Sequence, residues 1–143
     1  MRRAGNSRTV VATALVLAAA LALVAAASAS AARKATRAEA SAIKQVATKP
    51  CRDTQFGCNW HGARVSTANP RFAWANVTSE GYSGALVKRP RKGSLQFRVI
   101  GTQGGGIGEC RYWRKRAPDA VLRDLHIAGL VDSGGTVRNC GRR

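Results

Sequence analysis

The stretch RFAWANVTSEGYSGALVKR, residues 71–89, decides the fold because it contains two consecutive strand patterns with a turn between them. Its first half divides into the two sets of side chains that would point to opposite faces of a strand: Phe72, Trp74 and Asn76, and Ala73, Ala75 and Val77. Glu80 and Gly81 form the turn, and YSGALVKR, residues 82–89, continues as the second strand. The stretch therefore predicts an antiparallel pair of strands.

Further strand segments flank this pair on both sides. PRKG, residues 90–93, contains both Pro and Gly and joins the pair to SLQFRVIG, residues 94–101, as a hairpin. The residues that would share one face of that strand are Leu95, Phe97 and Val99. Upstream, ARVST, residues 63–67, has strand character, and residues 68–70 turn the chain. The sequence thus predicts an antiparallel sheet of three or four strands.

A helix is predicted on each side of the strands. ATRAEASAIKQVATKP, residues 35–50, has the pattern of an amphipathic helix with Thr36 and Glu39 in a capping box, and a mobile linker is the alternative. PDAVLRDLHI predicts a C-terminal helix that begins at Pro118 and stops before Gly129. The predicted fold class is α+β: a small antiparallel β-sheet of three or four strands packed by an N-terminal and a C-terminal helix, stabilised by two disulfides.

The disulfides are predicted from four cysteines, Cys51, Cys58, Cys110 and Cys140, an even number in a short chain. Four cysteines allow three connectivities, and the sequence alone leaves the choice open. The spacing favours Cys51 with Cys58, which would close a small loop, and Cys110 with Cys140, which would tie a helix to a strand. A zinc site is the alternative, but no C-x2-C or C-x4-C pair occurs, and no metal is expected.

Residues 1–31 have the composition of a secretory signal peptide. Three arginines precede an apolar run over residues 10–27, and the run ends in two A-x-A cleavage sites. An uncleaved membrane anchor is the alternative, because the run approaches the length that spans a bilayer. Cleavage would leave residues 32–143 as a single small secreted α+β domain with no integral membrane span. The expected location is extracellular, with retention at the cell envelope as a variant of it.

The chain is strongly basic, with 24 basic and 7 acidic residues. Loss of the three arginines in residues 1–31 would leave 21 against 7, a net charge of about +14. The expected partners are an anionic cell-wall polymer, nucleic acid or an acidic protein, and the alternative is a solvated basic surface without a dedicated ligand. Two clusters, KRPRK and RYWRKR, supply the predicted anion-binding residues: Lys88, Arg89, Arg91, Lys92, Arg111, Arg114, Lys115 and Arg116.

The second basic cluster follows a glycine-rich stretch, GTQGGGIGEC, residues 101–110. Glycines after a predicted strand are typical of phosphate-binding loops, but neither G-x-x-x-x-G-K-[ST] nor G-x-G-x-x-G occurs here. The stretch is therefore expected only to lead the chain from the sheet to Cys110. Tyr112 and Trp113 could stack on bases, but packing of Trp113 on the sheet is the favoured interpretation.

No catalytic residue and no cofactor is predicted. His61 and His126 are the only histidines, and Glu109 beside Arg111 and Arg114 is the grouping nearest to an acid/base set. His61 is interpreted as a loop residue, and His126 as a basic side chain at a helix end. A small nuclease-like hydrolase using His126 and Glu109, and a protease inhibitor with a disulfide-braced loop, are the alternatives to a binding protein. The chain is expected to be a monomer.

Four segments and the last cysteine together resemble a pattern of small secreted actinobacterial proteins of unassigned function: RVSTANPRFAWANVTS, GYSGALVKR, GTQGGGIGEC, APDAVLRDLHIAG and Cys140. Where that pattern often has Trp after the hairpin, this chain has Phe97. The resemblance implies export and an α+β fold but carries over no catalytic residue. The expected function is that of a secreted, basic, disulfide-stabilised binding protein at the cell surface.

Overall fold

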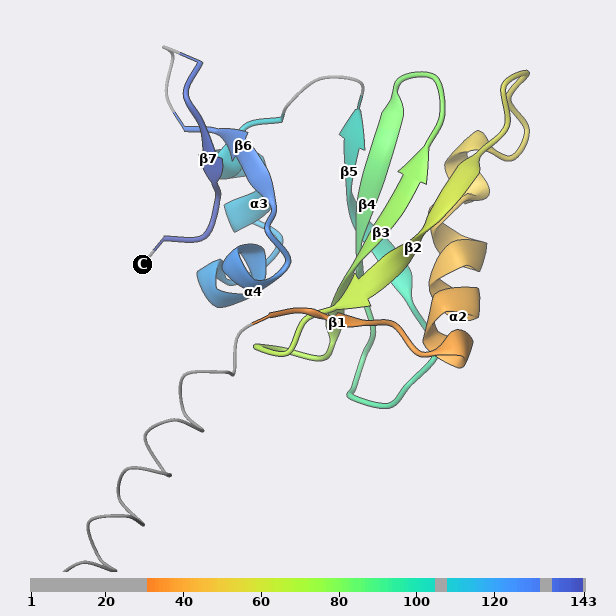
Figure 1. The fold of residues 1–143 in the computed structure, drawn as a ribbon, viewed down its shortest axis with the longest axis horizontal. Coiled ribbons are helices and arrows are strands. Elements are labelled where there is room, and N and C mark those ends of the chain that lie inside the picture. The colour runs from red at the N-terminus through yellow and green to blue at the C-terminus, as the bar shows by residue number, and fades with distance from the viewer. Residues whose placement is uncertain (1–30, 105–107, 132–134, 143) are drawn as a thin grey trace, which may run out of the picture.

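The computed structural model describes residues 31–104, 108–131 and 135–142, which form three layers (Figure 1). A five-stranded antiparallel sheet lies in the middle, with its strands in chain order: β1 (Arg33–Lys34), β2 (Asn59–Val65), β3 (Phe72–Thr78), β4 (Tyr82–Lys88) and β5 (Arg98–Gly104). One face carries the long helix and a short 3-10 turn: α2 (Arg37–Ala47) and η1 (Lys49–Cys51). The other face carries the C-terminal elements: α3 (Cys110–Arg114), α4 (Asp119–Asp124), β6 (Ala128–Leu130) and β7 (Val137–Asn139).

The α+β class is as predicted, but the described residues contain more strands than the three or four expected. The main sheet has five strands, and β6 pairs with β7 in a separate two-stranded sheet. β1 consists of two residues, Arg33 opposite Val65 and Lys34 opposite Arg64, so it is too short to show a periodic pattern. β2 begins at Asn59, ahead of the predicted segment, which places His61 in a strand rather than in a loop.

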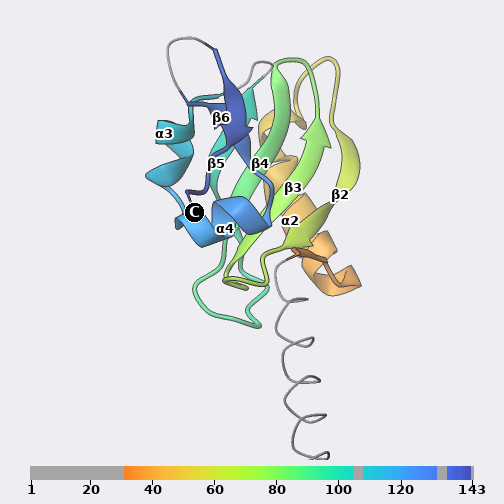
Figure 2. The same cartoon turned by 60° about the vertical axis from the view of Figure 1, so that its left-hand side comes forward.

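Both faces of the sheet are buried, and β3 shows this most clearly. The side chains that face α2 are small, namely Ala73, Ala75 and Val77, so helix α2 packs on this face through residues such as Ile43 and Ala47. The side chains that face α3 and α4 are large, namely Phe72 and Trp74. The ring of Trp74 meets that of Trp113 edge-on, with centroids 5.5 Å apart. The sheet therefore separates two hydrophobic cores (Figures 1 and 2).

Helix α2 begins at the predicted capping box. The Thr36 hydroxyl accepts a hydrogen bond from the Glu39 backbone N–H at 3.3 Å, and the Glu39 carboxylate accepts one from the Thr36 N–H at 3.0 Å. Pro50 lies in the 3-10 turn that follows, where the missing N–H leaves no hydrogen bond unmade. Local sequence is sufficient to start and stop this helix, so the linker alternative is wrong.

The strand predicted from residue 94 starts later than expected. Backbone pairing in β5 begins at Arg98, opposite Lys88. Leu95, predicted to share a face with Phe97, is 49% exposed in the connecting loop, whereas Phe97 is buried in the core beside α2. The basic residues of the connection therefore lie on a loop longer than a tight hairpin turn.

Within the described residues, the C-terminal layer contains two short helices, α3 and α4, instead of the one predicted. α4 follows Pro118 as predicted but ends at Asp124, well before Gly129. Gly129 belongs to β6, where a Cβ atom would lie 2.7 Å from the Cys140 sulfur, so its role is close packing rather than helix termination. Helix α3 was not predicted, because five residues are too few to show a helical period.

Two disulfides are present, and they join the pairs that the spacing favours. Cys51 and Cys58 have Cα atoms 5.5 Å apart, and Cys110 and Cys140 have Cα atoms 4.9 Å apart. Cys51 packs in the core beside α2, and the second pair packs in the core around Trp113. Each core therefore has its own covalent link.

The predicted signal peptide, residues 1–31, lies outside the described residues except for residue 31. Among the helices that the structure describes, none is long and apolar enough to cross a membrane. The longest of them, α2, has 11 residues.

Candidate anion-binding site

The eight predicted anion-binding residues lie in two groups. One group lies at the end of β4 and on the loop that connects it to β5: Lys88, Arg89, Arg91 and Lys92. The other lies on α3 and in the turn that follows it: Arg111, Arg114, Lys115 and Arg116. The side chains of Arg91, Lys92, Arg111 and Lys115 belong to exposed residues, whereas the remaining four are buried or half-buried. Lys88 and Arg89 line one pocket, Arg91 and Lys92 line another, and three residues of the α3 group line a third.

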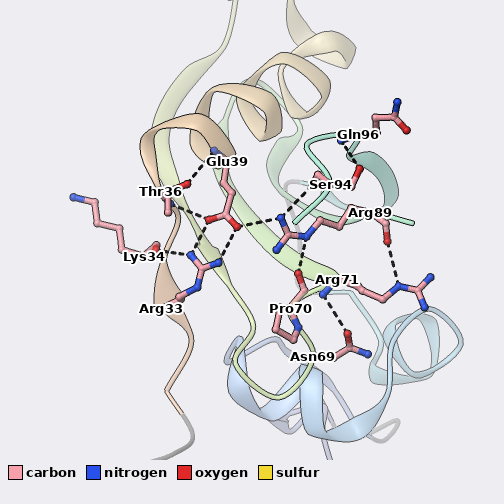
Figure 3. A network of polar contacts seen from close by, with 10 residues as sticks. All are labelled: Arg33, Lys34, Thr36, Glu39, Asn69, Pro70, Arg71, Arg89, Ser94 and Gln96. Carbon is pink, nitrogen blue, oxygen red and sulfur yellow. Dashed lines mark hydrogen bonds and ion pairs between the residues drawn. The ribbon is translucent and has the colours of Figure 1, made fainter. Parts of the chain in front are cut away.

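Arg89 differs most from the expectation of a surface contact, because its side chain is only 2% exposed (Figure 3). Its Nη1 atom lies 3.1 Å from the Glu39 Oε1 atom and donates to the Ser94 carbonyl at 3.1 Å. Its Nε atom donates to the Pro70 carbonyl at 2.8 Å. Figure 3 shows this guanidinium between the first turn of α2 and two loops, so Arg89 joins parts of the fold instead of meeting a ligand.

The carboxylate at the centre of this network is held in its charged form. Arg33 donates two hydrogen bonds to Glu39, at 2.7 and 2.8 Å. These bonds lower the pKa of Glu39 to about 2 against the opposing effect of burial, with smaller contributions from the Thr36 N–H and the charge of Arg89. Glu39 is therefore a structural counter-ion for two arginines.

Arg116 and Tyr112 cover the outer edge of the sheet. β5 is the last strand, so its outward N–H and C=O groups have no neighbouring strand. Arg116 Nε donates to the Ile100 carbonyl at 2.9 Å, and the Tyr112 hydroxyl accepts from the Thr102 N–H at 3.1 Å. The Arg116 guanidinium also lies 3.5 Å from the centre of the Tyr112 ring. Both side chains thus form hydrogen bonds with edge backbone groups that another strand could otherwise pair with.

The start of the glycine-rich stretch serves packing. A Cβ atom on Gly101 would lie 2.8 Å from Cζ3 of Trp113 and 2.9 Å from Cδ of Arg116. Trp113 is completely buried, which agrees with the packing interpretation and removes it from base stacking. Residues 105–107 of the stretch lie outside the described residues. Glycine is required at position 101 because the Trp113 ring packs closely against the backbone there, and not because a phosphate does.

A cationic pocket of about 480 Å³ opens where β4 and β5 meet the connecting loop. Its lining residues are Arg71, Lys88, Arg89, Pro90, Gln96, Phe97 and Arg98. None of these carries a carboxylate, and the one cation with an acidic partner is Arg89. Sequence reasoning missed Arg71 and Arg98. Arg98 could have been found from the hairpin, since pairing across it places Arg98 opposite Lys88.

A second pocket, of about 690 Å³, collects most of the α3 group. Its charged lining residues are Glu109, Arg111, Arg114, Lys115 and Arg142. Arg114 Nε donates to the Cys140 carbonyl at 2.8 Å and lies 3.9 Å from Asp119, so this arginine is partly engaged. The carboxylate of Glu109 compensates part of the positive charge in this pocket, whereas no acidic residue lines the pocket beside β5.

The candidate catalytic residues do not line a common pocket in the described part of the chain. Glu109 lines the pocket beside α3, whereas exposed His126 lines two others, against β7 and α4. His61 lies on β2 and its Nε2 atom is 2.9 Å from the Thr78 hydroxyl. His126 follows α4, as expected, in a left-handed conformation with φ of 54°. Among the described residues, no three His, Cys, Asp or Glu side chains form a group that could hold a metal ion.

No protein-family model, curated protein or solved structure matches the chain. The resemblance to small secreted actinobacterial proteins therefore stays a prediction.

Proposed function

We propose that this protein is a secreted, disulfide-stabilised binding protein that attaches to an anionic polymer at or near the cell surface, without turning it over. The observation that carries the proposal is the shortage of acidic partners for its cations. Within the described residues, ion pairs involve just three basic side chains: Arg33, Arg89 and Arg114. Some of the other cations are engaged by backbone carbonyls, such as Arg64 and Arg116, but exposed ones such as Arg91, Lys92, Arg111 and Lys115 can attract external anions.

The excess of positive charge at the surface is greater than the sequence count suggests, because two of the acidic side chains are buried. Glu39 is buried between two arginines, as described above. Asp124 is also buried and accepts hydrogen bonds from the Ser66 hydroxyl at 2.7 Å and from the N–H groups of Thr67 and Ala68. Burial alone would raise the pKa of Asp124, but these hydrogen bonds lower it. Two carboxylates thus hold loops together and do not compensate the surface charge.

Extracellular location is part of the proposal and is supported by two disulfides in a small chain, which are typical of oxidising compartments. The predicted signal peptide points the same way. Among the partners expected from the sequence, a polymer fits better than a compact acidic protein. The exposed cations are distributed over a loop, a helix and a sheet end, and a flexible chain can follow such a distribution.

The test is retention of the oxidised protein on heparin, nucleic acid and cell-wall polymer columns, each eluted by a salt gradient. The first variant neutralises four exposed predicted residues by substitution with Gln: Arg91, Lys92, Arg111 and Lys115. The control removes the same charge from the α2 side, again with Gln: Arg37, Lys44, Lys49 and Arg52. We expect the first variant to elute at much lower salt than the control. For nucleic acid, we expect its log–log salt slope to fall by up to about 3 to 4, because each lost phosphate contact removes about 0.9.

Equal losses in the two variants would show that attraction is generic and would contradict a dedicated surface. The column fractions should also be assayed for cleavage of the bound polymer. Turnover that disappears in Glu109→Gln or His126→Ala would replace the binding proposal by the hydrolase alternative.

A further inference from the structure

We infer that Lys88, Arg98 and Arg71 form a subsite for a phosphate group in the pocket beside β5. The inference rests on the proposed function in that it names the chemistry of one contact on the anion-binding surface. It goes further in assigning that contact to two residues, Arg71 and Arg98, that lie outside the basic sequence clusters.

The register of the sheet brings two of these cations together. Lys88 and Arg98 are directly opposite each other on neighbouring antiparallel strands, so their side chains leave the sheet on the same face. Like charges in this relationship destabilise a sheet, and opposite charges or apolar pairs are the stabilising choices. The pair joins the last residue of β4 to the first residue of β5. A bound anion converts this unfavourable pair into a favourable one.

The charged groups of these three residues keep donors free for a ligand. Among the described residues, neither Lys88 nor Arg98 has a hydrogen bond or ion pair from its charged group. Lys88 Nζ lies 5.1 Å from the centre of the Phe72 ring, which limits where the ammonium can go. Arg71 donates from Nε to the Arg89 carbonyl at 3.3 Å, and this bond leaves its two Nη atoms without a partner in the described part of the chain (Figure 3).

The surroundings of the three cations also favour an anion. No carboxylate lines the pocket, and the fourth cation in its wall, Arg89, is already paired with Glu39. Pro90 and Phe97 supply apolar wall, which lowers the local dielectric constant and strengthens attraction to an anion. The volume of about 480 Å³ lies within the range of about 300 to 1,000 Å³ that small-ligand pockets occupy.

Phosphate fits this arrangement better than a carboxylate. Two guanidinium groups can each offer two parallel N–H donors, and an ammonium adds a third cationic donor. A carboxylate has two oxygens and one negative charge, so it would leave two of the three cations uncompensated. A phosphate group presents more acceptor oxygens in a tetrahedral arrangement, and as a monoester or free ion it carries up to two charges at neutral pH.

The experiment follows thermal unfolding of the oxidised full chain at constant ionic strength while sodium phosphate replaces sodium chloride. We expect a saturable increase in Tm with phosphate, because a ligand that binds the folded state stabilises it. In a variant with Lys88→Gln and Arg98→Gln, we expect the phosphate Kd to weaken by at least about tenfold. We also expect the Tm of this variant in chloride to equal or exceed that of the wild type, since a repulsive pair has been removed.

The matched control carries Arg37→Gln and Lys44→Gln on α2, away from the pocket, and should keep the full phosphate response. Calorimetric titration with phosphate checks the Kd in each protein. A wild-type Tm that does not respond to phosphate would overturn the inference. So would an equal response in the Lys88/Arg98 variant.

Two sources of the phosphate group are distinguished by competition. If a phosphodiester polymer displaces inorganic phosphate and its own binding weakens in the Lys88/Arg98 variant, the subsite takes the phosphate of a polymer. If inorganic phosphate alone binds, the subsite takes free phosphate, and polymer binding is left to other residues. Polymer retention without any phosphate response would contradict the subsite and leave the proposed function standing. A phosphate response without retention on any polymer would support the subsite and contradict the proposed function.

Discussion

Arg89 and Glu39 form an ion pair in which the arginine Nη1 atom lies 3.1 Å from the carboxylate Oε1 atom and both side chains are almost completely buried. The pair connects the first turn of α2 to the end of β4. Arg33 donates to both oxygens of the same carboxylate. One acidic residue thus holds the N-terminal segment, the helix and the sheet together, and its removal would leave a buried guanidinium without a counter-ion.

The substitution Glu39→Gln tests this connection. Gln can still accept the hydrogen bond from the Thr36 N–H, so the capping box is retained while the charge is lost. We expect a loss of about 3 to 5 kcal/mol in the free energy of unfolding, as for other buried ion pairs that lose one partner. Chemical denaturation measures it. A loss below about 1 kcal/mol would mean that the network adds little to stability.

The same carboxylate predicts acid sensitivity. Its pKa is lowered from 4.5 to about 2 in the folded protein, so its contribution to stability is fully present above about pH 4.5 and is lost as the pH falls toward 2. At about 1.4 kcal/mol per pH unit, the loss is roughly 3 kcal/mol over that window. Denaturation at a series of pH values should show it. The Glu39→Gln protein should lose less stability over the same window, and an unchanged pH profile would contradict the assignment.

Gly101 provides a test of the glycine-rich stretch. In Gly101→Ala, the added methyl would press against Trp113 and Arg116, so we expect a loss of about 1 to 3 kcal/mol in stability. Gly108→Ala is the control, because its methyl would meet the indole nitrogen of Trp113 at 3.7 Å, an ordinary contact. That variant should remain within about 0.5 kcal/mol of the wild type. Equal effects in the two variants would show that flexibility, and not close packing, explains the glycine at position 101.

The two disulfides should differ in what they contribute. Cys110–Cys140 closes a sequence separation of 30 residues, and Cys51–Cys58 closes one of 7. In the chain-entropy model these loops correspond to about 4 and about 2.5 kcal/mol. Replacing each pair by serines and measuring denaturation should reproduce that order. The reverse order would mean that the small loop stabilises the folded state through contacts of its own.

Sequence patterns predicted the elements whose causes are local. The capping box of Thr36 and Glu39, the alternation in β3 and the proline before α4 each depend on neighbours a few residues away. β1, α3, β6 and β7 escaped prediction because elements of two to five residues show no period. They form through contacts with parts of the chain that sequence windows do not include.

The site was harder to predict because the same residue type has opposite roles within one basic cluster. Arg89 and Arg91 are two residues apart, yet Arg89 is buried against a carboxylate on α2 and Arg91 is exposed. Composition cannot distinguish them, because the partner of Arg89 comes from a distant segment. Arg98 shows the converse: it lies outside the basic clusters of the sequence, and the register of β4 and β5 places it opposite Lys88.

The pairing of the cysteines has a consequence for the order in which the molecule is made. The first cysteine is bonded to the second and the third to the fourth, so the two loops that they close do not overlap along the chain. A chain that is threaded into an oxidising compartment from its N-terminus presents Cys51 and Cys58 together before Cys110 arrives. If this chain is exported in that way, oxidation in the order of emergence would form the native bonds without passing through a non-native pair.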